Sequence, residues 1–589
     1  MPRSASFAPW LFVLLACGLI RAQEGRLPSR SLITPSNQGV SFAPVASFAY
    51  DEPKVLFRTS TRLVQVPVVV TDKSGRHIPS LPKDQFEILE DGKERKIATF
   101  EEVEIAADKA RVLPPAPPGV FRNAGIEIRE PHAVTVIAVD TVNTPFLDQA
   151  NARRVLARYL AHNLSAGHML AMVLMSSKGL KVVQGLTSDP APLINKLAKL
   201  GGELPAMQDV DTETQLALAT RSAPLLPANS RTSPSVLDDF VTSGDVMYAQ
   251  FKQDNAIEVT MRSFLQIAWS LSGVPGRKSL IWATSGFPFY LGSPGMVPGG
   301  RLSTLYERAM EALNDAQIAV YPVDVRGLVS TFPSADTASR NAGTAFASNL
   351  RERDWLQFST IATLQEFAEM TGGRAFYNSN DFDQGFRRAV DDSASYYLLG
   401  YYLDTKNDKP GWRKLKVKVR DKDSVVHART GFLVTNAAMN PQATKALDLS
   451  FALNSPFEAT AIPIWMQWQP KTGQDDPKNG EKKSGEKRKV GFELHIPGDV
   501  IATQGDQNAT ELDVFVVAAL SGTGRAISEP VQQTMKANLS ADTLARVRAQ
   551  GMKYSSDMAL PAGSYEVRFV VRDNVSGRVG SVSAPLTLN

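Results

Sequence analysis

An unbroken run of apolar and β-branched residues, from Ala133 to Val139, is the feature that most restricts how this chain can fold. Such a run predicts a strand that is buried on both faces, as in a parallel sheet covered by helices. The run ends on Asp140 and is followed by small polar residues up to Thr144 and by an amphipathic helix over 148–162. Because open α/β sheets bind ligands beyond the carboxyl ends of their strands, Asp140 stands where a binding site is expected.

Strands and helices alternate along the chain after this run. We expect further strands at 169–175, 180–184, 279–283 and 318–323, and helices at 189–200, 257–272, 302–314, 361–368 and 382–392. This alternation predicts a doubly wound, Rossmann-like α/β domain over residues 130–395. Residues 203–246 are rich in Pro, Ser and Thr, and they predict a long loop insertion.

Both flanks of the α/β region show β patterns. The segment 55–105 contains expected strands at 63–70, 86–89 and 97–103, and its Asp91-Gly92 pair predicts a hairpin turn. A second β segment covers 396–435. Since each segment has too few strands to bury a face alone, we expect the two to pack together. Residues 445–589 are expected to form a separate β-sandwich domain.

The N-terminus is typical of a secretory signal. A basic residue precedes a short apolar run, so we expect a signal peptide at 1–22 and a linker at 23–54. Two processing routes remain open, which are cleavage after Ala22 and lipid attachment at Cys17 within a lipobox-like sequence. Cys17 is the only cysteine, so the chain has no internal disulfide. Export without disulfides favours a bacterial envelope protein that is periplasmic, secreted or outer-envelope associated.

Several function classes are disfavoured by composition and motifs. A net charge of +4 over 589 residues, without a basic block, argues against a nucleic-acid partner. No further apolar stretch is long enough to predict an integral membrane span. The six histidines show no His-Glu-x-x-His spacing, and neither a Gly-x-Ser-x-Gly elbow nor a phosphate-binding loop occurs. We therefore predict a protein that is not an enzyme.

The order of the expected elements resembles a von Willebrand factor type A (vWA) domain. The resemblance rests on the strand ending at Asp140, the hairpin leading to 185–189, and the strand ending at 284–286. Shorter motifs resemble the vWFA-related Acidobacterial domain family, at 66–70, 84–86, 90–92, 140–144, 396–401 and 429–432. The resemblance covers about 60–435, and the C-terminal residues look like a β-sandwich appended to it. It implies a vWA fold with flanking all-β domains.

The resemblance also implies a site for a divalent cation. In vWA domains an Asp-x-Ser-x-Ser loop, a separate Thr and a later Asp bind the metal, and a partner protein completes its shell. Asp140 and Thr144 match the ends of that loop, Val142 replaces its middle Ser, and Ser285 stands where an Asp is usual. Candidates for the separate threonine are Thr212 and Thr214. With one carboxylate, this set implies a degenerate site that binds Mg²⁺ or Mn²⁺ weakly. The alternative is that Asp140 caps the next helix or bonds neighbouring loops.

Together these features predict an exported, non-enzymatic module for adhesion or assembly that binds a protein partner. The alternative from another class is an envelope hydrolase whose active site the motifs do not reveal, because catalytic triads are defined by geometry. A deep pocket with perturbed ionisable groups would favour the hydrolase. A flat, loop-rimmed surface around Asp140 would favour the binding module.

Overall fold

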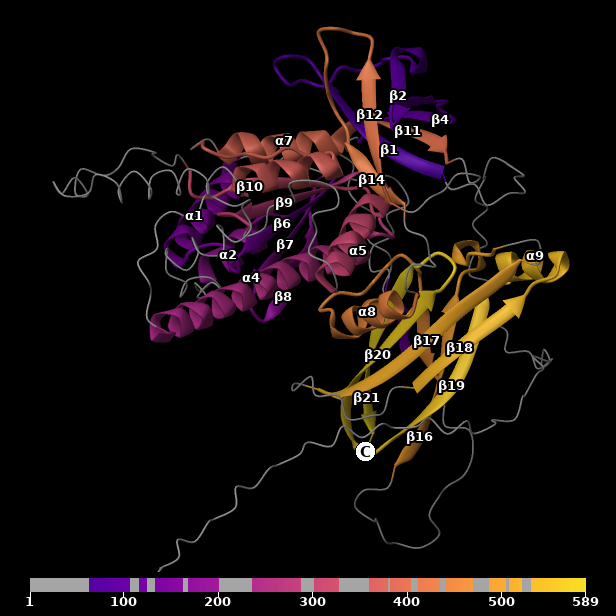
Figure 1. Cartoon of the computed structure of the whole chain (residues 1–589). Helices are drawn as coiled ribbons and strands as arrows, with labels where there is room; N and C mark the ends of the chain where they lie inside the picture. The colour runs from indigo at the N-terminus through magenta and orange to yellow at the C-terminus, as the bar shows by residue number, and fades with distance from the viewer. Residues whose placement is uncertain are drawn as a thin grey trace, which may run out of the picture. The chain divides into compact units, whose positions relative to one another are not determined.

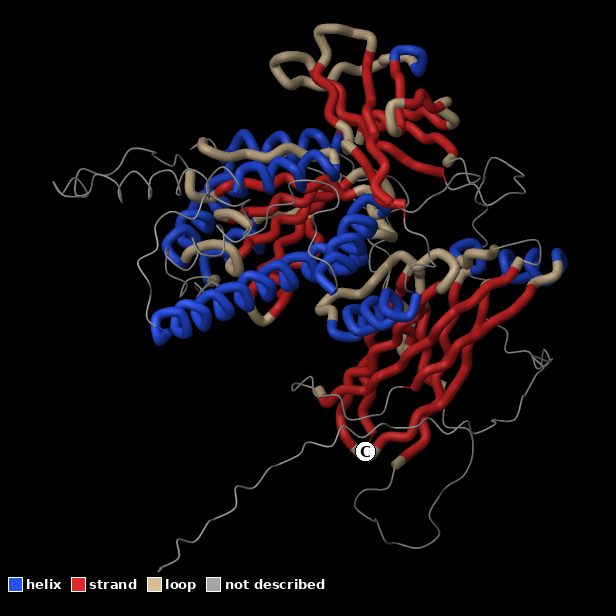
Figure 2. The backbone as a smooth tube through the Cα atoms, in the orientation of Figure 1, coloured by secondary structure: helices blue, strands red, loops and turns tan. Residues whose placement is uncertain are grey.

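In the part of the chain that it describes, the computed structural model contains five β-sheets, with helices packed on both faces of one of them (Figures 1 and 2). The residues that it describes are 63–105, 116–123, 133–162, 168–200, 236–287, 301–327, 360–379, 382–403, 411–434, 441–469, 487–504, 508–521 and 531–588. Among them, strand residues outnumber helical residues. Within these ranges no helix combines the length and the apolar character that a membrane crossing requires.

The predicted fold class, a doubly wound vWA-like α/β domain with flanking β domains, is wrong as a description of this chain. Four of the five sheets contain only antiparallel pairs, so the protein is a β-rich assembly of several sheets. The prediction gave too much weight to one buried run. Strands that alternate between buried and exposed residues are joined by short turns, and they form most of the sheet structure.

The sheet that contains parallel pairs is mixed, with the strand order β10-β9-β6-β7-β8. Its strands are β6 (Val134–Asp140), β7 (Met169–Ser176), β8 (Gly179–Thr187), β9 (Lys278–Thr284) and β10 (Ile318–Asp324). A two-residue turn joins β7 to β8, which forces this pair to be antiparallel. Every residue of β6, β7, β9 and β10 is buried, which explains their nearly continuous apolar sequences.

Helices cover both faces of the mixed sheet (Figure 1). One face packs against α1 (Phe146–His162), α2 (Ala191–Lys199) and α7 (Phe382–Ala394). The other packs against α4 (Val236–Leu271), α5 (Arg301–Asp315) and the helical residues 360–371. The predicted loop insertion at 203–246 is therefore wrong at its end, because 236–246 belong to α4; residues 201–235 lie outside the described part of the chain.

Strands from the two β segments that flank this sheet in the sequence are hydrogen-bonded to one another. The first segment gives β1 (Leu63–Thr71), β2 (Phe86–Glu90), β3 (Lys93–Arg95) and β4 (Thr99–Glu104), with a 3-10 turn at Lys83–Gln85. The second gives β11 (Ser395–Tyr402), β12 (Gly411–Val419), β13 (Val425–His427) and β14 (Gly431–Val434). The sheets β13-β1-β11-β4 and β14-β12-β2-β3 enclose one hydrophobic core. Asp91 and Gly92 have positive φ and form the turn between β2 and β3.

The C-terminal region is a sandwich of two antiparallel sheets around a third core. Its strands are β15 (Trp465–Trp468), β16 (Arg488–Ile496), β17 (Ala509–Leu520), β18 (Val531–Asn538), β19 (Met552–Leu560), β20 (Gly563–Asp573) and β21 (Val579–Leu588). Two helices were not expected here, α8 (Pro441–Asn454) and α9 (Ala541–Gln550), and a 3-10 turn covers Gly498–Val500.

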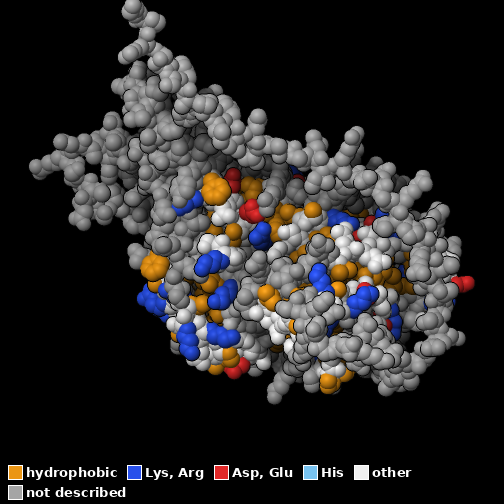
Figure 3. Space-filling view, turned by 90° about the horizontal axis from the view of Figure 1, so that it is seen from below, with side chains coloured by type: hydrophobic (Ala, Val, Ile, Leu, Met, Phe, Trp, Pro, Cys, Tyr) orange, Lys and Arg blue, Asp and Glu red, His pale blue; other side chains and the backbone are white. Residues whose placement is uncertain are grey.

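On the described part of the face in Figure 3, basic and hydrophobic side chains are interspersed and do not gather into one patch.

A strand from far earlier in the chain completes the sandwich. β5 (Val120–Arg122) pairs with β15 at the edge of the sheet β19-β16-β15-β5. The next residue, Asn123, is buried, and its amide donates to the carbonyls of Ala459 and Ile462 and accepts from the N–H of Ile464. The sandwich therefore uses residues from outside the predicted 445–589 domain.

Candidate functional site

The carboxylate of Asp140, at the end of β6, lies at the centre of the hydrogen bonds that order the carboxyl edge of the mixed sheet. Its Oδ1 accepts from the backbone N–H groups of Val142 and Asn143, at 2.9 and 3.0 Å. Its Oδ2 accepts from the Asn143 amide at 2.8 Å and from the Trp282 indole at 2.9 Å, and the Thr284 hydroxyl lies 2.9 Å away. Burial raises the pKa of this carboxyl, and the hydrogen bonds oppose that rise.

The other two predicted site residues lie beside this network. The backbone N–H of Ser285 donates to Oγ1 of Thr144 at 3.2 Å, so the ends of β6 and β9 are joined at this point. The carboxylate of Asp140 accepts a hydrogen bond from Thr284, the residue before Ser285, and not from Ser285 itself. All three predicted residues are buried, with exposed fractions of 5% or less. The structure thus brings Asp140, Thr144 and Ser285 to one edge, as the parallel order of β6 and β9 requires.

These residues do not fit a cation held through Asp140. A carboxylate offers about four lone pairs, and the donors around Asp140 already use both of its oxygens. A hard cation would have to displace several of these hydrogen bonds. At the position of the missing middle Ser, Val142 is fully buried against Ala256 and Val259 of α4. Among the described residues, no group of three or more His, Cys, Asp or Glu is arranged to hold a metal ion. Thr212 and Thr214 lie outside the described residues.

Asp148 on the first turn of α1 is a polar residue of this edge that sequence reasoning did not select. Its Oδ2 accepts a hydrogen bond from the Ser285 hydroxyl at 3.3 Å. Burial raises the pKa of the Asp148 carboxyl and the negative charge of Asp324 adds to the rise, whereas the Ser285 hydrogen bond and the Arg326 charge oppose it. A carboxylate in the first turn of a helix was visible in the sequence, but its approach to Ser285 depends on the tertiary structure.

A bidentate ion pair lies at the carboxyl end of β10. The Arg326 guanidinium donates to both carboxylate oxygens of Asp324, with Nε–Oδ1 at 2.9 Å and Nη2–Oδ2 at 2.7 Å. The Asn151 amide of α1 donates to the carbonyl of Val325 at 2.7 Å, which ties this helix to the same strand end. The edge therefore combines the hydrogen-bonded carboxylates of Asp140 and Asp148 with the ion pair of Asp324 and Arg326.

An aromatic side chain stands on the rim of this edge. Phe146, the first residue of α1, is 43% exposed, and Pro145 before it is also exposed. Large hydrophobic side chains are usually buried, and aromatic residues are enriched at protein interfaces relative to the rest of the surface. Phe146 therefore presents an exposed apolar surface at this edge of the sheet.

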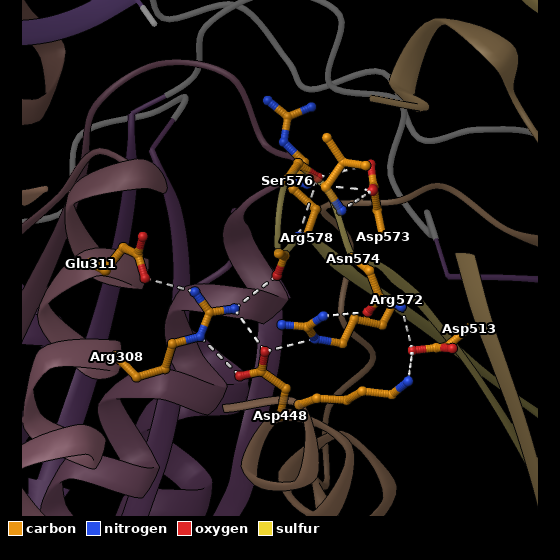
Figure 4. Close-up of polar contacts among 12 residues, drawn as sticks. Arg308, Glu311, Asp448, Asp513, Arg572, Asp573, Asn574, Ser576 and Arg578 are labelled. Carbon is orange, nitrogen blue, oxygen red and sulfur yellow. Dashed lines mark hydrogen bonds and ion pairs between the residues drawn. The ribbon is translucent and has the colours of Figure 1, made fainter. Parts of the chain in front are cut away.

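A second polar cluster joins α5, α8 and the sandwich (Figure 4). Asp448 of α8 is fully buried and accepts from Arg308 of α5 and from Arg572 of β20. Lys445 and Asn574 both bond Oδ2 of Asp513, at 2.6 and 2.7 Å. Opposite charges are matched within the cluster, so we regard it as a structural joint.

Comparisons with known proteins do not place the chain in a family. No family description and no curated protein matches its sequence. Among solved structures, three N-terminal domains of the type V pili tip protein Mfa5 from Porphyromonas gingivalis match 70% of this chain and 75% of that one, at 9% identity and a TM-score of 0.19. The human COPII-coat protein Sec24c matches 78% of this chain at 9% identity and a TM-score of 0.16, and the match spans 44% of that protein. Similarity at this level does not identify a fold.

Proposed function

We propose that this chain is an exported, non-enzymatic module that binds a protein partner at the carboxyl edge of the mixed sheet, in adhesion or assembly. The observation that carries the proposal is the exposed Phe146, which shares the first turn of α1 with the half-buried Asp148. A few aromatic side chains that become buried on binding often account for much of the binding energy of a protein interface. An acceptor such as Asp148 would select a partner that presents a basic or hydrogen-bond-donating group.

The rigidity of the edge supports this function. The loop between β6 and α1 is fixed by Asp140, and the Gln149 amide donates to the carbonyl of Thr144 at 2.9 Å. Phe146 is therefore presented from a loop and helix start that need little ordering on binding. A preorganised surface loses less conformational entropy when a partner docks. In this proposal Asp140 acts as the organiser of the surface and makes no contact with a cation.

Site-specific photo-crosslinking in the producing cells tests the proposal. A photo-reactive phenylalanine analogue at position 146 should crosslink to a defined protein, and Asp148→Ala should reduce the yield at least several-fold. The matched control is the same analogue at Tyr402 of β11, which is 41% exposed and belongs to the β domain of β1. Equal crosslinking at the two positions, or a yield at 146 that Asp148→Ala leaves unchanged, would contradict the proposal.

Export is part of the same proposal, and it has a separate test. A fusion of residues 1–30 to a reporter should leave the cytoplasm because of its short apolar run behind a basic residue. Cys17→Ser distinguishes the two processing routes, since only a lipid-anchored protein should lose its membrane association. A reporter that stays inside the cell would remove export from the proposal.

A further inference from the structure

A small cavity lies at the opposite end of the mixed sheet, where β9 and β10 begin. Its lining residues come from the β domain of β1 and from the mixed sheet with its helices, and they include Pro67, Arg277, Asn314, Gln317, Thr371 and Arg429. The cavity volume is about 10 Å³, which is room for one water-sized occupant. It is thus placed where an occupant would contact both parts of the fold.

Hydrogen-bond donors face this cavity from buried side chains. Arg277 is 1% exposed; its Nη2 donates to the hydroxyl of Tyr321 at 2.9 Å and to the carbonyl of Gly372 at 2.6 Å. Its Nε has no hydrogen-bond partner among the described residues, and neither has Nδ2 of Asn314, which is 8% exposed. Buried N–H groups of this kind cost about 1–3 kcal/mol each unless an acceptor meets them. The cavity therefore favours an occupant that accepts hydrogen bonds.

The charge of the lining is positive. Arg277 and Arg429 both line the cavity, and none of its lining residues carries a carboxylate. The buried carboxylate of Asp392 is bonded to the Tyr321 hydroxyl at 2.8 Å and to Arg374 at 3.2 Å. A permanently charged guanidinium in a dry site is strongly stabilised by an opposite charge nearby.

The amide of Gln317 is compatible with the same occupant. Its Nε2 donates to Oε1 of Gln65 at 2.6 Å, while its own Oε1 is buried. Oxygen and nitrogen of an amide group are interchangeable by a flip. Flipping both amides keeps the bond between Gln317 and Gln65 and turns an NH₂ group of Gln317 toward the cavity.

We propose that this cavity binds one monatomic anion of the chloride class, held by Nε of Arg277 and the Asn314 amide. The anion joins the β domain to the mixed sheet through electrostatic attraction to Arg277 and Arg429. A halide is somewhat larger than a water molecule, whereas polyatomic anions such as sulfate or a carboxylate exceed a volume of about 10 Å³ by a much wider margin. The site is remote from the proposed partner-binding edge, so it is independent of that function.

A nearby histidine reports the same excess of positive charge. Burial lowers the pKa of His427 to about 4, and the charges of Arg374, Arg277 and Arg388 contribute to the decrease, with Asp392 acting against it. His427 lies on β13, which pairs with β1 of the β domain. The arginine charges that act on His427 thus include that of Arg277, which lines the cavity.

Thermal unfolding of the full-length protein in different sodium salts tests the proposal. At equal ionic strength and pH 7.5, chloride and bromide should raise the unfolding midpoint by about 1–3 °C above the value in gluconate, which is too large for the cavity. The increase should saturate with halide concentration, whereas general screening by salt does not distinguish these anions. Equal midpoints in chloride and gluconate would overturn the proposal.

A variant that supplies its own negative charge sharpens the test. Asn314→Asp has nearly the same shape as the native side chain and places a carboxylate beside Arg277, so the halide dependence should be lost. Gln467→Glu is the matched control, because it adds the same charge on an exposed residue of β15 and should keep the dependence. Halide dependence that survives in Asn314→Asp contradicts the proposal.

Crystals grown with sodium bromide give a direct measurement. An anomalous peak within about 3.5 Å of Nε of Arg277 supports the site. A water molecule at this position without anomalous signal, at bromide concentrations that saturate the thermal effect, would overturn it.

Discussion

The guanidinium of Arg308 forms two hydrogen bonds with the carboxylate of Asp448, from a position 140 residues earlier in the chain. The Nε–Oδ1 distance is 2.8 Å and the Nη2–Oδ2 distance is 3.0 Å, which is the bidentate geometry of strong charge-assisted bonds. Arg572 of the sandwich donates to the same carboxylate at 2.9 Å. One buried carboxylate therefore joins a helix of the mixed sheet to the C-terminal sandwich.

Replacing Asp448 should be strongly destabilising. Asp448→Asn removes the buried carboxylate that Arg308 and Arg572 share and leaves Arg308 with Glu311 as its remaining ion-pair partner, so the free energy of unfolding should fall by about 3–5 kcal/mol. Urea denaturation followed by circular dichroism measures the change. The control is Asp557→Asn, whose partner Lys489 is 80% exposed and whose loss should cost less than about 1 kcal/mol. A similar decrease in the free energy of unfolding for both variants would contradict this role of Asp448.

Asn123 should be essential for docking β5 onto the sandwich. Asn123→Ala leaves the backbone groups of Ala459, Ile462 and Ile464 without the partner that this side chain supplies, and unfolding should become easier by about 2–3 kcal/mol. Hydrogen exchange should also show faster opening of β15. Asn454→Ala, on an exposed helix end, is the control and should change stability by less than about 0.5 kcal/mol. Unchanged exchange in β15 would refute the role of Asn123.

The stability of the mixed sheet should depend on pH through Lys278. Burial lowers the pKa of this fully enclosed lysine from 10.5 to about 7, and its Nζ donates to the carbonyl of Val274. Between pH 7 and 10.5 the unfolded state binds more protons than the folded state, so stability rises with pH across this window. The cost of the buried charge is fully present below pH 7.

Lys278→Met removes the buried charge, so the change in the free energy of unfolding measures what that charge costs. The free energy of unfolding should increase by about 2–4 kcal/mol at pH 6 and by much less at pH 10. Denaturation at the two pH values measures the difference. Lys196→Met, on an exposed position of α2, is the matched variant, and the relevant quantity is the difference between the two substitutions. A gain for Lys278→Met that is equal at both pH values would contradict the assignment.

A carboxylate at position 285 should create an affinity for divalent cations that the native set of residues does not favour. In Ser285→Asp the new side chain faces Asp148, whose Oδ2 is 3.3 Å from the native hydroxyl. Two carboxylates at this distance repel, so the midpoint of thermal unfolding should fall and millimolar Mg²⁺ or Mn²⁺ should restore part of it. Ser285→Asn, which has no charge, is the control. Failure of either cation to act selectively on the Asp variant would contradict this prediction.

Local patterns predicted much of the secondary structure but not the class of the fold. The periods of helices and strands are local, so β6, β9 and α1 lie close to their expected positions. The meeting of Thr144 and Ser285 also follows from local patterns, because parallel strands end at one edge. The bond from Trp282 to Asp140 was not predictable, since it depends on which side chains of neighbouring strands share a face.

Long-range pairings explain the remaining failures. A three-residue strand such as β5 carries almost no periodic signal, and it is stabilised by its pairing with β15 and by the hydrogen bonds of Asn123. The start of α4 was missed because its polar, Ser- and Thr-containing sequence favours a loop until packing outweighs propensity. The helix α8 is rich in Ala and Leu, and it was missed because the β pattern expected after it was extended over it. The emphasis on one buried run led to the wrong fold class for a chain in which hairpins dominate.

The pairing of β1 with β11 also sets an order of events during synthesis. The hydroxyl of Tyr397 donates to the carbonyl of Ile78, which was made 319 residues earlier. The strands at the start of the nascent chain must therefore wait, with open edges, until the middle of the protein has been translated. Such edges readily pair with other chains. A polypeptide released before β11 has emerged would carry β1 and β4 with no strand between them, and it would depend on chaperones to remain soluble.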